Sequence, residues 1–444
     1  MPEETSPKHM VLLVDRKFTA DQLKIRRNQA YADDLLTCLR IFKKWGYDII
    51  WVDEGIEAMK AVKSYASKLS LILMEAYMPT KGMTMTRMIR LNPDATSIPV
   101  ALMSSQFTTA DLQAAAKAGA AECLPKPFTD SSQIEIKLTA VRNTSHQQPS
   151  PPAPDRVAHI LRELSRIDDL PVMAPVFSEI ERLSRDPKAT TEDYSAVIEL
   201  DMAITSQLLR LSNSAAFSFS RKITSITDAI NLLGLRTVVN FVRTLSVIGS
   251  FRKYSRIPFA AQEFWLHAIA CGVTARTLAG RPQIQKAFPA DAIDPFMGGM
   301  VHDIGKMIFG YFFTDLFQLV MDTAQAQGKT LYEIESDVLG ITHAEVGSAL
   351  AARWQLPESL AAVIGGHHNP PKDASPTTAL IHVADAACRM MGYTFKERKP
   401  DELLVSDAAL ARLNIDRNTL STLLTDIDAE VRAQIADTFS AIFK

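Results

Sequence analysis

Short apolar runs alternate with longer amphipathic stretches over the first 130 residues of the chain. The runs are Val11–Val14, Ile49–Val52, Leu71–Met74, Val100–Met103 and Glu122–Leu124. Runs of this length, separated by stretches with helical spacing, are typical of buried strands connected by helices. The pattern predicts an α/β domain in which helices cover a parallel five-stranded sheet.

A proline-rich stretch separates this region from a second one. Residues 145–155, SHQQPSPPAPD, contain four prolines and no large apolar side chain, so they are expected to be extended. From about residue 160 onward, apolar residues recur at helical spacing. The clearest series are Val176, Ile180 and Leu183, then Leu200, Ile204, Leu208 and Leu211. The second region is therefore predicted to be all-α.

These patterns divide the chain into four predicted parts. They are the α/β domain at 8–140, a proline-rich linker at 141–159, a larger helical domain at 160–390 and a C-terminal helical extension at 391–444. The extension has apolar positions at Leu420, Leu423 and Leu424. They either pack within the chain or form a dimer, and the sequence leaves both open.

Composition narrows the classes of partner. The chain has 48 basic and 50 acidic residues, and this balance provides no overall field for nucleic acid or an anionic membrane. The four cysteines lie far apart without a CxxC motif, which argues against a disulfide framework or a thiolate zinc site. We find neither an export signal nor an apolar run of about 18 residues. A cytoplasmic protein without nucleic-acid or membrane partners is expected.

Polar residues follow four of the predicted strands. Asp15 ends the first strand, MPxxG (Met78–Gly82) follows the third, Ser104 follows the fourth and Lys126–Pro127 follow the fifth. Together they resemble a response-regulator receiver domain of two-component systems. The resemblance implies a doubly wound sheet with its site at the carboxyl ends of the strands. It also implies that carboxylates hold magnesium, an aspartate on the third strand takes a phosphoryl group, the hydroxyl senses it and the lysine pairs with it.

Two positions depart from the receiver pattern. Glu75 stands where the acceptor aspartate belongs, and Arg16 stands where a second metal-binding carboxylate is expected. We therefore expect neither phosphorylation nor magnesium binding. Glu75 either imitates the phosphorylated anion by approaching Lys126 or Ser104, with Arg16 replacing the cation, or is a partly solvated acid in a scaffold.

The helical region resembles an HDOD domain, a relative of the HD-superfamily hydrolases. The resemblance extends over residues 160–390 at many separate segments, including LPVMAPVFSEIERLSRDP, LLRLSNSAAF, FWLHAIA, GGMVHDIGKMIF, ITHAEVGSALAARWQLPESLAAVIGGHH and HVADAA. It implies a compact helical bundle with a regulatory and mainly non-catalytic role.

Five histidines and two aspartates of this region form a candidate metal site. They are His267, His302, Asp303, His343, His367, His368 and Asp385. Imidazole and carboxylate suit iron, manganese or zinc, and two such ions can activate water for attack on a phosphodiester. Lys306 follows His302 by four residues, so it shares that helix face and is the candidate phosphate contact of a hydrolase.

Two observations favour a structural role for the same residues. The sequence after the paired histidines, HHNPPKDASP, lacks the Gly-Tyr-Pro segment of HD-GYP phosphodiesterases. Buried histidine and aspartate side chains can also satisfy each other by hydrogen bonding.

The sequence thus predicts a bacterial signal-transduction regulator with a degenerate receiver and an HDOD output that acts through protein–protein interaction. The expected partners are signalling proteins, such as enzymes of second-messenger metabolism or a histidine kinase phosphorelay. The alternative is a metal-dependent phosphohydrolase or phosphodiesterase that acts on a cyclic dinucleotide or another nucleotide. The identity of the partner and a homodimeric state stay open.

Overall fold

A computed structural model of the chain describes most of its 444 residues. The described residues are 9–15, 26–144, 156–167, 171, 173–215, 217, 221–251, 261–289, 292–395 and 403–443. Arg16 and the proline-rich residues 145–155 lie outside them. The chain forms two compact units, one of Met1–Asp168 with Phe312–Thr342 and the other of Asp169–Tyr311 with His343–Lys444.

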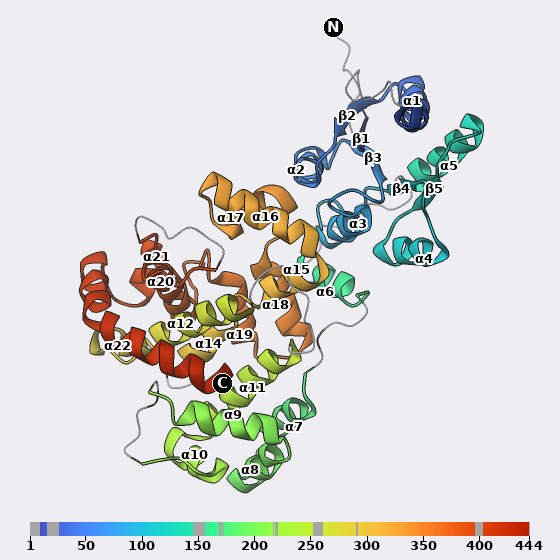
Figure 1. The fold of residues 1–444 in the computed structure, drawn as a ribbon. Helices are drawn as coiled ribbons and strands as arrows, with labels where there is room; N and C mark the ends of the chain where they lie inside the picture. The colour runs from blue at the N-terminus through green and yellow to red at the C-terminus, as the bar shows by residue number, and fades with distance from the viewer. Residues whose placement is uncertain are drawn as a thin grey trace. The chain divides into compact units, whose positions relative to one another are not determined.

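The first unit contains the predicted five-stranded parallel sheet (Figure 1). Its strands are β1 (Met10–Val14), β2 (Asp48–Val52), β3 (Leu69–Glu75), β4 (Val100–Ser104) and β5 (Glu122–Pro125), in the order β2-β1-β3-β4-β5. Every residue of β3 is buried. Because helices cover both faces of such a sheet, its central strands are apolar runs without alternation, as the sequence pattern predicted.

Five helices follow the strands in turn. They are α1 (Arg26–Lys44), α2 (Gly55–Tyr65), α3 (Gly82–Leu91), α4 (Thr109–Ala118) and α5 (Ser131–Thr144). Phe42 of α1 and Leu138 of α5 belong to one core cluster with the side chains of one sheet face. On the other side, α2 packs against α3 and α3 against α4.

Two further segments complete this unit. Helix α6 (Arg156–Leu164) packs against α3, where an imidazole nitrogen of His159 lies 2.8 Å from the carbonyl oxygen of Arg90. A later segment contributes α16 (Thr314–Gln327), α17 (Leu331–Ile334) and the π-helix η2 (Glu335–Leu339), which pack against α2 and α3. The boundaries of the two compact units therefore differ from the predicted domain limits, because both segments bury apolar surface beside the sheet.

The second unit is helical throughout its described residues. In chain order its helices are α7 (Pro175–Ser184), α8 (Thr191–Glu199), α9 (Met202–Ser212), α10 (Ile226–Leu233), α11 (Leu235–Ser250), α12 (Ala261–Ala279), α13 (Pro282–Gln285), α14 (Pro295–Val301), α15 (Ile304–Phe312), α18 (His343–Arg353), α19 (Glu358–Gly366), α20 (Pro376–Met390), α21 (Asp407–Arg412) and α22 (Arg417–Phe443). Helix α12 lies against α14, α20 and α22. Within the described chain, no helix has the length and apolar character needed to cross a bilayer.

Local signals mostly agree with the helix ends. Ser225 accepts a hydrogen bond from the amide of Asp228 and caps α10, which ends at Gly234 with a φ of 85°. The predicted helical series was wrong at Leu200, because this residue is 84% exposed and lies outside α9. The carboxylate of Asp201 accepts hydrogen bonds from two amides of α9, so that helix begins after it.

The C-terminal extension packs within the chain. Leu420 and Leu423 of α22 are buried, and this helix contacts α12 and α9. Leu424, by contrast, is only partly buried. The burial of this apolar face shows that α22 belongs to the helical core of the second unit.

Candidate functional site

His302 and Asp303 lie at the junction of two consecutive helices. Asp294 caps the start of α14, and Pro295 occupies its first turn, where the missing amide costs nothing. His302 is the C-terminal cap of α14, and α15 begins at Ile304. The junction turns both side chains into the buried interior of the unit, where each is at most 1% exposed.

Glycines allow the surrounding helices to approach this junction. An added Cβ at Gly305 would collide with the backbone carbonyl of His343, and one at Gly299 would collide with the backbone of Gly272 in α12. The absence of side chains at these positions brings α18 to α15 and α12 to α14. His267 on α12 and His343 on α18 are thereby placed beside Asp303.

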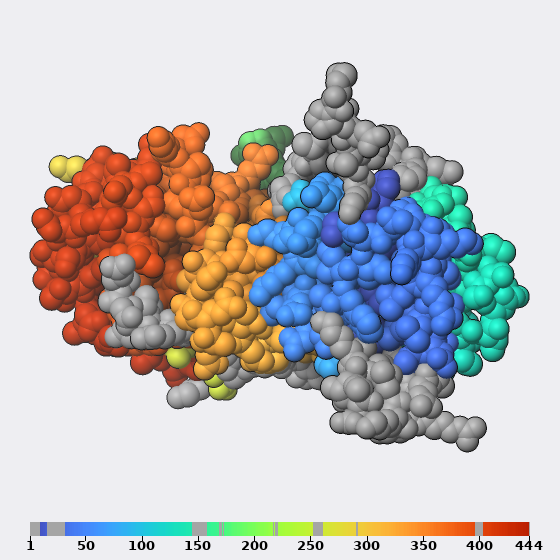
Figure 2. Space-filling model, turned by 90° about the horizontal axis from the view of Figure 1, so that it is seen from above, coloured from blue at the N-terminus to red at the C-terminus, as the bar shows by residue number. Residues whose placement is uncertain are grey.

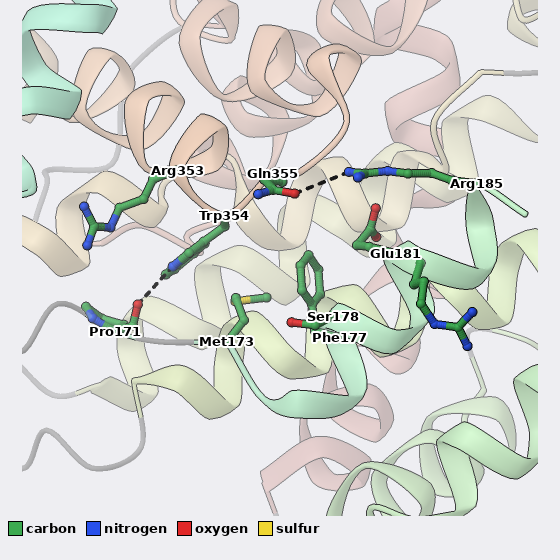
Figure 3. Close-up of a pocket in the computed structure, with 10 residues that line it drawn as sticks. Pro171, Met173, Phe177, Ser178, Glu181, Arg185, Arg353, Trp354 and Gln355 are labelled. Carbon is green, nitrogen blue, oxygen red and sulfur yellow. Dashed lines mark hydrogen bonds between the residues drawn. The ribbon is translucent and has the colours of Figure 1, made fainter.

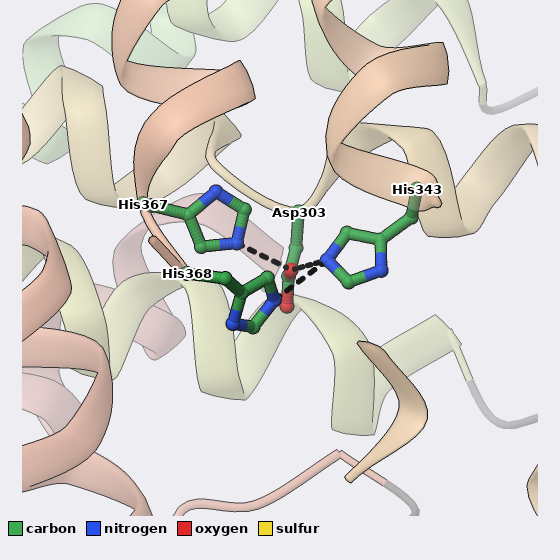
Figure 4. A group of neighbouring side chains, drawn as sticks. All are labelled: Asp303, His343, His367 and His368. Carbon is green, nitrogen blue, oxygen red and sulfur yellow. Dashed lines mark hydrogen bonds and ion pairs between the residues drawn. The ribbon is translucent and has the colours of Figure 1, made fainter. Parts of the chain in front are cut away.

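Asp303 lies at the centre of the site (Figure 4). Its Oδ1 is 3.1 Å from His343 Nε2 and 3.5 Å from His367 Nε2. His368 completes this side, with its Nε2 2.9 Å from His343 Nε2. These four residues, Asp303, His343, His367 and His368, can offer one ligand atom each within 4.8 Å of one another.

The other carboxylate oxygen of Asp303 faces a second group. Its Oδ2 lies 3.3 Å from Nε2 of both His267 and His302, and 2.8 Å from Lys306 Nζ. His267 Nε2 is also 3.4 Å from Asp385 Oδ1. The structure thus brings the seven predicted ligand residues and Lys306 into one buried cluster, in which Asp385 contacts His267. Lys306 pairs with Asp303 as a counter-charge.

The histidine hydrogen bonds suit metal binding. The Nδ1 atoms of His267, His302 and His367 each lie 2.7 Å from a backbone carbonyl oxygen, so each Nδ1 carries the proton and Nε2 presents its lone pair. His302 Nε2, His367 Nε2 and Asp303 Oδ1 are buried and make no hydrogen bond of good geometry within the described residues, although the two nitrogens lie 3.3 and 3.5 Å from oxygens of Asp303. Buried polar atoms without partners are costly, and a divalent cation between them would satisfy all three. The donor set therefore fits a transition metal.

The histidines of the site differ in their protonation. Burial opposes the protonation of His267, but Cys388, Asp303 and Asp385 raise its pKa well above the usual value, so this imidazole must lose a proton before its Nε2 can bind a metal. Burial lowers the pKa of His367 to about 4, even though Asp303 lies beside it, so the imidazole is neutral at pH 7. Burial opposes ionisation of Asp303, but the adjoining imidazoles and the Lys306 ammonium hold its pKa well below the usual value. Neutral imidazole and ionised carboxylate are the protonation states that bind metals.

Two nearby residues escaped the sequence interpretation. Cys388 lies 3.8 Å from His267 Nδ1 and could hold a metal with His267 and Asp385. Its spacing of three residues from Asp385 on α20 is the only sequence signal that could have revealed it. The other, His382, has a structural role: its Nδ1 faces the His367 carbonyl oxygen at 2.7 Å and its Nε2 accepts the Ser406 amide.

In the receiver-like site of the first unit, the charged side chains pair with one another. Lys126 Nζ lies 2.9 Å from Glu75 Oε2 and 3.2 Å from Asp15 Oδ2. All three side chains are at least 90% buried. Ser104 is buried as well, and its Oγ accepts a hydrogen bond from the amide of Gln106. The structure therefore brings Asp15, Glu75 and Lys126 together, whereas Arg16 lies outside the described residues.

A separate hollow of about 480 Å³ lies between α7 and the end of α18 (Figure 3). Its floor includes Phe177 and Trp354, and the indole nitrogen of Trp354 donates to the carbonyl oxygen of Pro171. Three exposed arginines stand around it: Arg182, Arg185 and Arg353. The sequence interpretation missed these arginines, because Arg353 is distant in sequence from the other two.

Two family models match the chain. The response regulator receiver domain model matches residues 33–138, and the HDOD domain model matches residues 170–370. Both lie within the regions assigned from the sequence motifs. The HDOD match includes Phe312–Thr342, the segment that is compact with the sheet.

Individual relatives agree with these matches. An uncharacterised protein of Treponema pallidum is 28% identical over 274 residues, or 60% of this chain, and the match spans only 52% of that relative. The structure of an HDOD domain protein of unknown function from Geobacter sulfurreducens is 25% identical, with 63% of this chain and 96% of that chain covered at a TM-score of 0.53. A Shewanella amazonensis structure assigned to the phosphohydrolases is 21% identical, with 63% and 97% covered, but its TM-score of 0.49 supports no argument about activity.

Proposed function

Because this chain joins a response regulator receiver domain to an HDOD domain, we propose that it is a signalling regulator that acts by binding another protein and whose receiver is not phosphorylated. The fusion of these two domains fits a signalling protein. The proposed partner is a signalling protein such as a histidine kinase or an enzyme of second-messenger metabolism. The HDOD resemblance, which implies a regulatory module, supports binding as the mode of action.

The observation that carries the proposal is the ion pair between Lys126 and Glu75. The lysine that pairs with a phosphoryl group in receivers is here already 2.9 Å from a carboxylate at the acceptor position. Glu75 Oε1 also accepts a hydrogen bond from the amide of Tyr77. The ammonium of Lys126 and the amide of Tyr77 thus occupy both oxygens of this carboxylate. This arrangement supports a receiver that is held permanently in one state by its own glutamate.

Incubation with acetyl phosphate and magnesium tests the loss of phosphorylation. We expect no gain of about 80 Da by intact-mass spectrometry and no shifted band on a phosphate-affinity gel. The double variant Arg16→Asp/Glu75→Asp restores both residues of the receiver pattern and is the matched control for labelling. A labelled wild-type protein whose label is lost in Glu75→Gln would overturn the proposal.

A second candidate function is a metal-dependent phosphohydrolase. The buried atoms without hydrogen-bond partners, His302 Nε2, His367 Nε2 and Asp303 Oδ1, favour it. Asp303, His343, His367 and His368 would hold one ion, and His267 and His302 would hold another with the same aspartate. Such ions supply an activated water and stabilise negative charge on a phosphoester. His368 is the most exposed of the histidines at this centre and marks its solvent side.

The metal content of protein purified without a histidine tag tests this candidate before any substrate is chosen. A metal centre predicts bound manganese, iron or zinc at near-stoichiometric level by plasma mass spectrometry. It also predicts that Asp303→Ala removes the metal, since Asp303 lies within 3.5 Å of His267, His302, His343 and His367. Metal-free wild-type protein that does not take up Mn²⁺ in a titration would reject the metal centre.

A further inference from the structure

The segment 312–342 connects two parts of the candidate metal centre. It follows Asp303 and Lys306 in the chain and ends directly before His343. The segment is compact with the receiver sheet rather than with the helices that carry these residues. In the space-filling view its surface lies directly against that of α2 and α3 (Figure 2).

Asn92, just after α3, makes the most buried polar contact with this segment. Its side-chain nitrogen donates to the Leu339 carbonyl oxygen at 3.1 Å, and both residues are at most 2% exposed. The other end of the amide is also engaged, because Asn92 Oδ1 accepts the Asp94 amide at 3.0 Å. These two bonds orient the amide so that its donor faces Leu339.

The shape of the segment matches this contact. Gly340 has a φ of 68°, and a Cβ there would lie 2.5 Å from the side-chain nitrogen of Asn92. Only glycine both adopts this conformation readily and leaves room for the amide. The contact therefore holds the backbone three to four residues before His343.

Charged side chains hold the same segment nearby. Lys63 on α2 donates to the Ser336 carbonyl oxygen at 2.6 Å and lies 3.9 Å from the Asp337 carboxylate. Lys81 lies 3.9 Å from Asp315. Lys81 belongs to the loop between β3 and α3, which also follows Glu75. Residues 76–81 therefore connect Glu75 of the receiver site to Lys81, which lies beside Asp315 of the segment 312–342.

We propose that Asn92 is a positioning residue for His343: by holding the Leu339 carbonyl, the receiver unit sets the start of α18 and thereby the affinity of the Asp303 centre for metal. The inference rests on the metal centre of the second candidate function. It makes the receiver a structural regulator of that centre through covalent continuity of the chain, without phosphoryl transfer. Changes at partners of metal ligands typically alter metal affinity by about 10- to 100-fold.

Asn92→Asp tests the contact, because it keeps Oδ1 for the Asp94 amide and replaces the donor to Leu339 by a carboxylate oxygen that repels the carbonyl. The matched control is Thr86→Val, which removes a buried hydrogen bond of the same receiver helix, from Thr86 Oγ1 to the Gly82 carbonyl, without touching the segment. Lys63→Met is a milder second variant at a partly exposed position, usable if Asn92→Asp does not fold. The two measurements that follow are made on the full chain.

The first readout is hydrogen exchange of peptides that cover the start of α18. We expect roughly tenfold faster exchange there in Asn92→Asp and a smaller increase in Lys63→Met, with wild-type rates in Thr86→Val. The second readout is calorimetric titration with Mn²⁺, for which we expect about tenfold weaker binding in Asn92→Asp only.

The outcomes separate this inference from the metal centre itself. If the wild type binds Mn²⁺ and Asn92→Asp binds it equally well, the inference is overturned. If the wild type binds no Mn²⁺, the metal centre fails, and exchange alone decides the positioning role. In that case, equal exchange in Asn92→Asp and Thr86→Val overturns the role, whereas faster exchange in Asn92→Asp alone supports it.

Discussion

Lys126 is the residue on which the receiver site depends most. Removing it would take away the ammonium that lies 3.2 Å from the buried Asp15 carboxylate and 2.9 Å from that of Glu75. We predict that Lys126→Met destabilises the receiver by about 3–5 kcal/mol in urea denaturation, the range for breaking a buried ion pair from one side. Lys44→Met, which breaks an exposed pair with Glu135, should cost less than about 1 kcal/mol. Equal costs would contradict the account of this pocket.

His382 gives the second unit a pH-dependent stability. Burial lowers its pKa more than the bond to the His367 carbonyl raises it, so the folded state resists protonation. As the pH falls below the ordinary histidine value of about 6.5, the unfolded chain takes up the proton first and stability is lost. We predict that His382→Gln shows a smaller loss of stability than wild type between pH 7.5 and 5.5, measured by urea midpoints. Parallel losses would show that His382 does not contribute.

The position of a single residue could be predicted only where a local sequence pattern indicated it. Asp15, Glu75 and Lys126 follow strand ends, so their meeting at one sheet edge was predictable from the strand pattern. The contact of Asn92 with Leu339 joins residues 247 positions apart. No periodicity or motif records such a pairing, because it depends on how one element packs on another. The proximity of Cys388 to His267 was hidden for the same reason.

At the scale of elements, glycine determines how closely α15 and α18 approach. We predict that Gly305→Ala costs about 3 kcal/mol or more, since the methyl group would collide with the His343 carbonyl and must push the helices apart. Gly249→Ala in α11 is the matched control, because its added Cβ meets nothing within 4 Å. It should be neutral or stabilising by up to about 1 kcal/mol. Thermal denaturation of both variants measures the difference, and a tolerated Gly305→Ala would refute the close approach.

Helix α22 should contribute to the stability of the second unit. Ile427 is fully buried on its inner face, so Ile427→Ala is predicted to cost about 2–5 kcal/mol. Thr425→Ala on the exposed face should change stability by less than about 0.5 kcal/mol. Urea denaturation followed by circular dichroism compares the two. A small cost at Ile427 would favour the dimer interface over packing within the chain.

Helix and strand types were predictable from the sequence, but one helix boundary was not. The helical spacing of apolar residues included Leu200 in the predicted series, although α9 begins only after the capping carboxylate of Asp201. Capping competed with periodicity there, and the local hydrogen bonds decided the boundary. At Ser225 and Gly234 the capping residue and the end of the apolar series coincide with the ends of α10.

At the scale of the whole molecule, the compact units do not follow the order of the residues along the chain. Phe312–Thr342 lies within the HDOD match, yet it is compact with the receiver sheet. Sequence motifs cannot reveal this, because a family pattern records which residues recur and not which surface an inserted segment packs against.

The central claim, that the chain regulates by binding rather than by catalysis, is tested most directly by a turnover assay. Full-length protein supplemented with Mn²⁺ or Fe²⁺ would be incubated with cyclic dinucleotides and a generic phosphodiester, beside its Asp303→Ala variant. We predict that the wild type releases no more product than Asp303→Ala. Robust turnover that disappears in Asp303→Ala would contradict the claim and establish the phosphohydrolase instead.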